Sequence, residues 1–295
     1  MELPKVRGVY KLNYNLSHLT WFKVGGSADI LFKPEDVDDL ISFLKQNDSK
    51  MPVLALGAGS NLIIRDQGIE GVVVKLGQKF THIEKTADGN LAVGAGCLNY
   101  NLAKFCQLNS IKNFEFLIGI PGTVGGGIAM NAGAYGAEFK DIVHSVQAID
   151  AKGDKMLIPV DQIGFSYRSN NLPNNLIFTQ VIFTATRGNA QEITRKMDHI
   201  MNSRLASQPV STKTSGSTFA NPDGMKAWEL IDKAGLRGKL IGGAEISKMH
   251  CNFMINNGNA TAADMENLGE YVRGIVKEHS GVELIWEIKR IGRHG

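Results

Sequence analysis

The chain has 295 residues, is 43% hydrophobic and 21% charged, and carries a formal net charge of +3. This length and hydrophobic content are sufficient for two domains with cores of their own. A charge this close to neutral, without long basic runs, argues against nucleic acid as the main partner. A small anionic ligand remains compatible with the composition.

Cysteine and histidine usage bounds the chemistry further. Cys97, Cys106 and Cys251 are odd in number and form no CxxC pair, which predicts free thiols in a reducing compartment. The seven histidines are scattered and form no HExxH motif, so no metal site is predicted. The sequence has no apolar signal segment and no run of about 18 apolar residues. We therefore expect a cytoplasmic protein without a membrane partner.

In chain order, the hydrophobic pattern predicts strands first and helices later. Predicted strands occupy residues 28–32, 53–57, 72–76, 91–93, 144–150, 155–160, 175–186 and 282–291. Predicted helices occupy residues 35–46, 98–108, 189–205, 224–234 and 261–279. The change from strand-rich to helix-rich sequence falls at Gly188, and this order favours α+β domains over a regularly alternating doubly wound sheet.

The segment from Gly119 to Gly136 is the richest in glycine, with seven glycines among eighteen residues. Glycine at this density disfavours the interiors of helices and strands, so the segment gains little as plain scaffold. Its isoleucine, valine, methionine and tyrosine residues are not typical of a solvated linker. Two interpretations remain. Bare backbone N–H groups hold an anion such as a diphosphate, or two segments cross tightly in the interior.

A second glycine cluster, Gly57-Ala-Gly-Ser-Asn61, follows the predicted strand over residues 53–57. The dinucleotide-binding fingerprint G-x-G-x-x-G needs a sixth-position glycine and a helix that opens at the turn. Here the sixth residue is Leu62, and no helix opens at the turn. Neither glycine cluster ends in Gly-Lys-Ser/Thr, so neither a Rossmann fingerprint nor a P-loop is predicted.

Three side chains are candidates for chemistry. Arg168 has the planar guanidinium that clamps a carboxylate, although a surface ion pair is the commoner role of a single arginine. Ser217 lies in a segment, residues 215–222, whose composition is that of an ordinary loop and that lacks a G-x-S-x-G motif. Glu287 shares a predicted strand face with Ile285, where it meets either a cleft or solvent.

Together, the motifs resemble those of the UDP-N-acetylenolpyruvoylglucosamine reductases, the flavoenzymes that complete UDP-N-acetylmuramate in bacterial cell-wall synthesis. The resemblance extends from about residue 20 to residue 292 and is highly specific in order and spacing, although each motif alone is weak. The motifs are TWFKVGG (20–26), LGAGSNL (56–62), FLIGIPGTVGG (116–126), MNAGAYG (130–136), Tyr167-Arg168, GSTF (216–219), Asn221-Pro222, LIDKAGL (230–236), IGGA (241–244), ATA (260–262) and Glu287.

The resemblance implies a two-part FAD-binding domain of the vanillyl-alcohol-oxidase-like type, over residues 20–188 and split near residue 76. An α+β substrate-binding domain follows over residues 189–295, and its last strand, about 282–291, is a candidate to return to the first domain. FAD is expected to be non-covalent, with NADPH as co-substrate. The residues expected to bind FAD are Gly57, Gly59, Ser60, Asn61, Gly119, Pro121, Gly122, Thr123, Gly125 and Gly126.

Carried over residue by residue, the resemblance implies that Arg168 is a catalytic arginine, Ser217 the proton donor and Glu287 the catalytic acid. Asn221 and Tyr167 are the implied substrate contacts. How Glu287 acts, by polarising charge or by relaying a proton, stays open.

The sequence departs from the family at two places. Ala220 stands before Asn221, where the family often has lysine, so one substrate contact is missing or replaced. No tyrosine occurs between Tyr167 and Tyr271. The chain therefore resembles the shorter form of the family, which lacks the tyrosine-bearing loop that covers the substrate.

The implied reaction is the NADPH-dependent reduction of the enolpyruvyl ether of UDP-N-acetylglucosamine enolpyruvate, in a ping-pong order. Reduced flavin is expected to deliver a hydride to C3 and Ser217 a proton to C2. Two rival hypotheses are an FAD-dependent alcohol or amine oxidase on the same scaffold and a nucleotide-binding module without catalysis. An oxidase would not need Ser217, and a non-catalytic module would not need all three candidate side chains.

Overall fold

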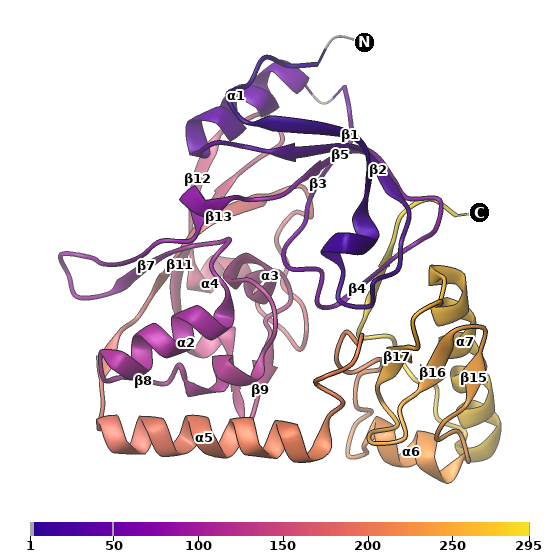
Figure 1. The fold of residues 1–295 in the computed structure, drawn as a ribbon. Helices are drawn as coiled ribbons and strands as arrows, with labels where there is room; N and C mark the ends of the chain where they lie inside the picture. Colours follow the sequence, from indigo (N-terminus) through magenta and orange to yellow (C-terminus); the bar gives the residue numbers. More distant parts are fainter. Residues whose placement is uncertain (1–2, 49, 295) are drawn as a thin grey trace. The chain divides into compact units, whose positions relative to one another are not determined.

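The structure is a computed structural model that describes residues 3–48 and 50–294 (Figure 1). The chain forms two compact units, and it passes from one to the other at five points along the sequence. Unit 1 comprises Met1–Leu12, Ile30–Ala58 and Gly71–Asn202, and unit 2 comprises Asn13–Asp29, Gly59–Glu70 and Ser203–Gly295.

These units are divided differently from the predicted ranges of 20–188 and 189–295. Residues 59–70 belong to unit 2, and most of helix α5 (Ala190–Ser207) belongs to unit 1. The terminal strand β18 (Lys289–Ile291) pairs in parallel with β4 (Leu62–Ile64), and both strands lie in unit 2. The assignment of FAD and substrate to particular residue ranges stays a prediction.

A four-stranded sheet begins the fold, with the strand order β1-β2-β5-β3. Its strands are β1 (Val9–Asn15), β2 (Ser27–Lys33), β5 (Ile69–Val74) and β3 (Val53–Ala55). Helix α1 (Val37–Asn47) buries Leu40, Phe43 and Leu44 in a core that includes Phe32 of β2. The helix begins where the Asp36 side chain accepts a hydrogen bond from the Asp39 N–H at 3.0 Å, which satisfies one of the free N–H groups of the first turn.

The second sheet of unit 1 has five antiparallel strands in the order β12-β11-β13-β7-β6. They are β12 (Lys155–Pro159), β11 (Val143–Ile149), β13 (Ile177–Phe183), β7 (Leu91–Gly94) and β6 (Ile83–Lys85). The predicted strands over residues 144–150 and 155–160 pair as the antiparallel hairpin β11–β12. Helices α2 (Asn99–Leu108) and α5 share this sheet's core through buried residues such as Leu102 and Met197.

The glycine-rich segment contains a short helix, α3 (Val124–Ala129), although its composition disfavours one. Thr123 caps the helix by accepting a hydrogen bond from the Gly126 N–H at 3.3 Å, while Val124 and Ile128 are fully buried. A Cβ placed on Gly127 would lie 2.2 Å from the ring of Phe139. Tertiary packing therefore overrides helix propensity, and glycine is required at position 127 because the aromatic ring occupies the space of a side chain.

Unit 2 combines a small antiparallel sheet with two helices. The sheet contains β15 (Leu240–Ile241), β16 (Ala244–Ile246) and β17 (Met254–Asn256), and the helices are α6 (Ala227–Lys233) and α7 (Ala262–Ser280). Thr261 and Asp264 form a capping box at the start of α7. The short elements of the whole chain that have not yet been named are η1 (Leu16–Leu19), η2 (Gln78–Phe80), β8 (Ile111–Lys112), η3 (Glu115–Gly119), β9 (Gly133–Ala134), β10 (Ala137–Glu138), η4 (Phe139–Asp141), α4 (Val160–Ile163) and β14 (Thr186–Arg187).

The predicted terminal strand is much shorter than expected, because regular pairing is confined to Lys289–Ile291. Residues 282–288 nevertheless keep the predicted alternation of burial. Leu284 and Ile288 are buried, whereas Ile285 is 70% exposed. The alternation of side chains is thus a property of the extended backbone and does not require a complete strand partner.

The packing of Gly127 generates a test of the unit 1 core. We expect Gly127→Ala to lower the free energy of unfolding by about 1–3 kcal/mol, because the new methyl group must displace the Phe139 ring. Thermal unfolding of the ligand-free protein, followed by circular dichroism, measures the effect.

The neighbouring Gly126→Ala is the matched control in the same helix. Its Cβ would meet only the Thr123 Oγ1, at 3.4 Å, so stability should be unchanged or raised by up to about 1 kcal/mol. Equal losses in both variants would contradict the packing explanation.

Candidate active site

Arg168 lies in a tight turn of unit 1. The Ser166 N–H donates to the Ser169 carbonyl at 3.0 Å, and the Ser169 N–H donates to the Ser166 carbonyl at 3.3 Å. Arg168 itself has a φ of +54°, in the left-handed region that residues with a side chain rarely adopt. Its guanidinium carbon lies 4.9 Å from the ring centroid of the exposed Tyr167. Backbone strain of this kind concentrates at functional sites.

Two asparagines connect this turn to the glycine-rich segment. Asn131 Nδ2 donates to the Ser166 carbonyl at 3.0 Å. Asn170 Nδ2 donates to the carbonyls of Ile128 and Ala129, both at 3.1 Å. The glycine-rich segment therefore holds the turn that carries Arg168. The sequence patterns of these two segments did not predict this connection.

In unit 1, the backbone segment at Gly57 approaches the segment at Gly122 and Thr123 closely. A Cβ on Gly57 would lie 2.8 Å from the Thr123 Oγ1, and Gly122 has a φ of +123°. Within residues 3–48 and 50–294, the N–H groups of Gly57 and Gly122 donate no hydrogen bond. Free N–H groups in glycine backbone are the donors that an anion such as a diphosphate requires, so these residues fit that part of FAD.

Lys75 adds a positive charge to the Gly57 turn. Its half-buried amine donates a hydrogen bond to the Gly57 carbonyl. Burial is the main cause that lowers the pKa of Lys75, and repulsion from Lys33 adds to it. Lys75 is not among the predicted site residues, because nothing in the local sequence relates residue 75 to the glycine cluster eighteen residues earlier.

Gly59, Ser60 and Asn61 of the same cluster belong to unit 2. Gly59, at a φ of +63°, accepts a hydrogen bond from the Trp21 N–H at 3.0 Å, and a Cβ there would lie 2.2 Å from the Leu19 carbonyl oxygen. Asn61 Nδ2 donates to the Glu287 carbonyl at 3.0 Å, and its own carbonyl accepts from the Lys289 N–H at 3.1 Å. Asn61 thus holds the backbone of a candidate catalytic residue.

Ser217 and Glu287 come from neighbouring segments of unit 2. The Glu287 N–H donates to the Thr218 carbonyl at 2.9 Å, and the Ala220 N–H donates to the Ile285 carbonyl at 2.9 Å. Both candidate side chains are half-buried, so neither has the fully exposed position of an ordinary surface group. The structure therefore pairs the backbone segments that carry two predicted residues, which are 70 positions apart in sequence.

Asn252 fixes the serine segment from its other side. It is buried, its Oδ1 accepts from the Phe219 N–H at 2.9 Å, and its Nδ2 donates to the Phe219 carbonyl at 2.8 Å. In addition, the Thr218 N–H donates to the Asn252 carbonyl at 2.7 Å. The buried Asn252 side chain thus makes the two hydrogen bonds to the Phe219 backbone that a neighbouring strand would otherwise make.

Asn221, predicted to contact the substrate, has a structural partner. Its Oδ1 accepts a hydrogen bond from the Ala227 N–H at 3.0 Å, at the first residue of α6. This bond supplies one of the acceptors that the first turn of a helix needs. A direct role in substrate binding stays a prediction.

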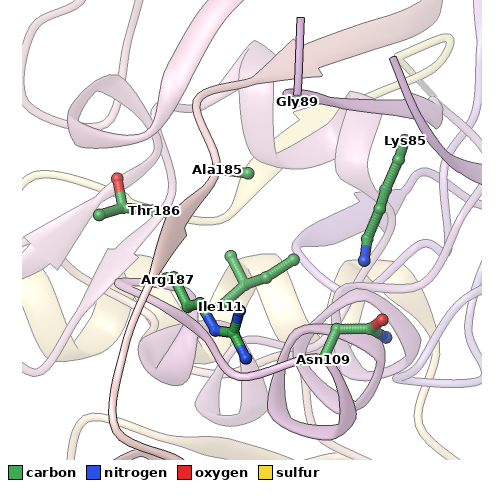
Figure 2. A pocket seen from close by; sticks show the side chains of 7 residues that line it. All are labelled: Lys85, Gly89, Asn109, Ile111, Ala185, Thr186 and Arg187. Atoms are coloured by element: carbon green, nitrogen blue, oxygen red, sulfur yellow. The ribbon is translucent and has the colours of Figure 1, made fainter. Parts of the chain in front are cut away.

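Unit 1 has a hollow of about 330 Å³ that is lined by none of the predicted site residues (Figure 2). Figure 2 shows Lys85 and Arg187 on either side of Ile111. The hollow is lined by Lys85, Gly89, Asn109, Ile111, Ala185, Thr186 and Arg187.

The three cysteines are buried and unpaired, as predicted. Among residues 3–48 and 50–294, no group of three or more His, Cys, Asp or Glu side chains is arranged to hold a metal ion. A search of the same residues for a helix long and apolar enough to cross a membrane finds none.

Comparison with known proteins identifies two domains. Residues 28–156 match an FAD-binding domain, and residues 208–291 match the C-terminal domain of UDP-N-acetylenolpyruvoylglucosamine reductase. The chain thus has the architecture of a flavoprotein whose FAD-binding domain precedes a second α+β domain, which confirms the predicted fold class and cofactor.

Individual relatives extend this match to the whole chain. The UDP-N-acetylenolpyruvoylglucosamine reductase of Rickettsia peacockii is 63% identical over 292 residues, which covers 99% of both chains. That of Rickettsia canadensis is 60% identical over 295 residues, covering 100% of this chain and 99% of its own. The crystal structure of the Thermus caldophilus reductase is 32% identical, with a TM-score of 0.83 over 97% of this chain and 99% of its own. The chain belongs to the UDP-N-acetylenolpyruvoylglucosamine reductase family.

The contacts of Asn252 give a test of how the serine segment is held. We expect Asn252→Ala to lower the free energy of unfolding of unit 2 by about 1–3 kcal/mol, because it leaves buried polar groups of Phe219 without partners. All three tryptophans, at positions 21, 228 and 286, lie in unit 2. Tryptophan fluorescence during urea unfolding therefore reports this unit.

Asn257→Ala is the control, because the Asn257 side chain binds Glu245 in an exposed position. Its effect should stay within about 0.5 kcal/mol. A loss in Asn252→Ala no larger than that of the control would show that the Asn252 bonds contribute little.

Proposed function

We propose that this chain reduces the enolpyruvyl ether of UDP-N-acetylglucosamine enolpyruvate to UDP-N-acetylmuramate, with NADPH as the reductant and in the cytoplasm. The observation that carries the proposal is the pairing of the Ser217 and Glu287 segments, with the Glu287 N–H 2.9 Å from the Thr218 carbonyl. Family membership supports the choice of substrate, since the Rickettsia relatives bear the name of this reductase.

FAD, when bound, supplies the hydride that is added to C3 of the enol ether. The free N–H groups of Gly57 and Gly122 support a role in holding the FAD diphosphate. The extent of the matched FAD-binding domain supports unit 1 as the main FAD unit, and that of the C-terminal domain supports unit 2 as the substrate unit. The residues proposed to bind FAD are Gly57, Gly59, Ser60, Asn61, Gly119, Pro121, Gly122, Thr123, Gly125 and Gly126.

Arg168 offsets the negative charge that develops at C2 and at the adjacent carboxylate during reduction. A guanidinium suits this task, because it keeps its positive charge and donates to both oxygens of a carboxylate at once. Its turn is held by hydrogen bonds at both ends, so little reorganisation is needed when charge develops. Removing a placed stabiliser of this kind costs about 2.7–4 kcal/mol of transition-state stabilisation.

Ser217 donates the proton that C2 receives. A serine hydroxyl is ordinarily a poor acid, but a carbanion-like C2 is basic enough to take its proton. Glu287, in the segment paired with that of Ser217, either polarises the developing charge or relays a proton. Tyr167 and Asn221 are the proposed substrate contacts, and the site is that of the shorter family form.

Ser217→Ala separates the two half-reactions. We expect NADPH to bleach the flavin of this variant at the parent rate, because no proton from Ser217 is needed for that step. Reoxidation by the enolpyruvyl substrate should slow by roughly 10²–10⁴-fold, the usual contribution of a positioned proton donor. Anaerobic stopped-flow absorbance of the flavin measures both rates.

Ser211→Ala is the matched control, because Ser211 is exposed and in the same unit. It should leave both half-reactions unchanged. Normal reoxidation of Ser217→Ala would mean that another group donates the proton.

The FAD contact of Gly126 is testable by binding alone. Gly126 is exposed and its Cβ would meet only the Thr123 Oγ1, so Gly126→Ala should fold. We expect its FAD dissociation constant to rise by at least roughly tenfold, or about 1.4 kcal/mol, because the methyl group enters the space of the cofactor. Quenching of flavin fluorescence during titration of the apoprotein measures this.

Gly274→Ala provides the comparison, because this helical glycine of α7 is exposed and has no atoms within 4 Å of an added Cβ. Its FAD affinity should equal that of the parent. If Gly126→Ala also binds FAD with parent affinity, Gly126 does not approach the cofactor.

A further inference from the structure

We propose that Asn131 is a positioning residue for the reduction, because its buried amide holds the turn that presents Arg168. The inference rests on the proposed function, since it concerns the arginine that stabilises the developing charge. Asn131 lies in the glycine-rich segment, and Arg168 follows it by 37 residues. Both residues lie in unit 1.

The Asn131 side chain has one permitted orientation. It is completely buried. Its Nδ2 donates to the Ser166 carbonyl at 3.0 Å and to the Glu138 carboxylate, while its Oδ1 accepts from the Lys140 N–H at 3.0 Å. Rotating the amide by half a turn would place its oxygen against two acceptors and its nitrogen against a donor. The bond to the Ser166 carbonyl is therefore fixed by the other two.

The Ser166 carbonyl is the acceptor that closes the Arg168 turn. It accepts from the Ser169 N–H at 3.3 Å as well as from Asn131. Arg168, within the turn, has a φ of +54°, and Asn131, outside it, has a φ of +40°. An unfavourable backbone conformation persists only where the surroundings enforce it. Asn131 supplies a constraint from outside the turn.

The opposite end of the turn is held by Asn170. Its amide donates to the carbonyls of Ile128 and Ala129, the last residues of α3. A Cβ on Gly133 would lie 3.3 Å from the Arg168 Nη1, so the guanidinium lies close to the backbone of the same segment. The segment that contains Asn131 thus holds the turn at both ends and lies beside the guanidinium of Arg168.

Asn47 provides a comparison that separates positioning from simple stability. It is also buried in unit 1, its Nδ2 donates to the Met51 carbonyl at 3.0 Å, and its Oδ1 accepts from the Met51 N–H at 3.2 Å. These bonds stabilise the end of α1 and do not involve the Arg168 turn. A purely structural asparagine should behave like Asn47.

The test compares Asn131→Asp with Asn47→Asp in the FAD-loaded enzyme. Asn131→Asp keeps the side-chain shape but places a carboxylate oxygen where the amine donated, so it faces the acceptors of Ser166 and Glu138. We expect normal FAD content and normal bleaching by NADPH. Reoxidation by the enolpyruvyl substrate should slow by roughly 10–100-fold, as expected for a displaced catalytic group.

Two readouts do not depend on turnover. Calorimetry with UDP-N-acetylmuramate and the oxidised enzyme should show weaker binding to Asn131→Asp, because Arg168 faces the ligand carboxylate in the proposed function. Hydrogen exchange of the peptide over residues 164–171 should be faster than in the parent. Asn47→Asp should change neither measurement, even if it lowers the melting temperature.

Asn170→Asp is the second variant, because Asn170 is only half-buried and its loss is less harmful to folding. It should reproduce the selective loss of reoxidation, and it decides the matter if Asn131→Asp does not fold. The positioning role is overturned if the folded variants reoxidise and bind ligand normally while Arg168→Ala is slow. If Arg168→Ala itself reoxidises at the parent rate, the proposed role of Arg168 fails and the inference fails with it.

Discussion

A steric constraint in the core of unit 1, the packing of Gly127 against Phe139, determines how helix α3 lies. The Phe139 ring occupies the space of a missing side chain and lies 6.3 Å from the ring of Phe116 and 6.1 Å from that of Phe183. This contact fixes helix α3 to the aromatic core. Because Asn131 follows α3 directly, the same contact sets the position from which the Arg168 turn is held. The steric requirement for glycine at position 127 thus contributes, through α3 and Asn131, to the position of the proposed catalytic arginine.

Unit 2 holds its candidate side chains in a similar way, with amide side chains in place of regular strands. Asn252 binds both polar groups of Phe219, and Asn61 binds the Glu287 carbonyl. Ser217 and Glu287 consequently lie on short, irregular segments that are nonetheless fully anchored. Such anchoring combines a defined geometry with a backbone that a ligand is able to approach, which an extended sheet ladder would cover.

Local sequence patterns predicted individual helices and strands well, but they did not predict which residues distant in sequence pair with each other. The β11–β12 hairpin and the alternating burial of Leu284 and Ile288 follow from periodicity over a few residues. Helix α3 was missed because packing overrides the low helix propensity of glycine. No local pattern relates β18 to β4, or Asn131 to Ser166, because these partners are distant in sequence. The roles of Arg168, Ser217 and Glu287 came from the family resemblance, since each residue alone fits an ordinary surface role.

The chain crosses from one unit to the other at five points, which restricts the segments that recombination is able to exchange with another protein. A gene fragment that encodes only residues 203–295 would omit Phe22, Val24 and Ile63, which belong to the same buried core as α7. It would also leave β18 without β4. A single recombination event therefore cannot transfer the second unit intact to another scaffold. The two units are expected to be inherited together, and their diversification should proceed by substitution and loop change rather than by domain shuffling.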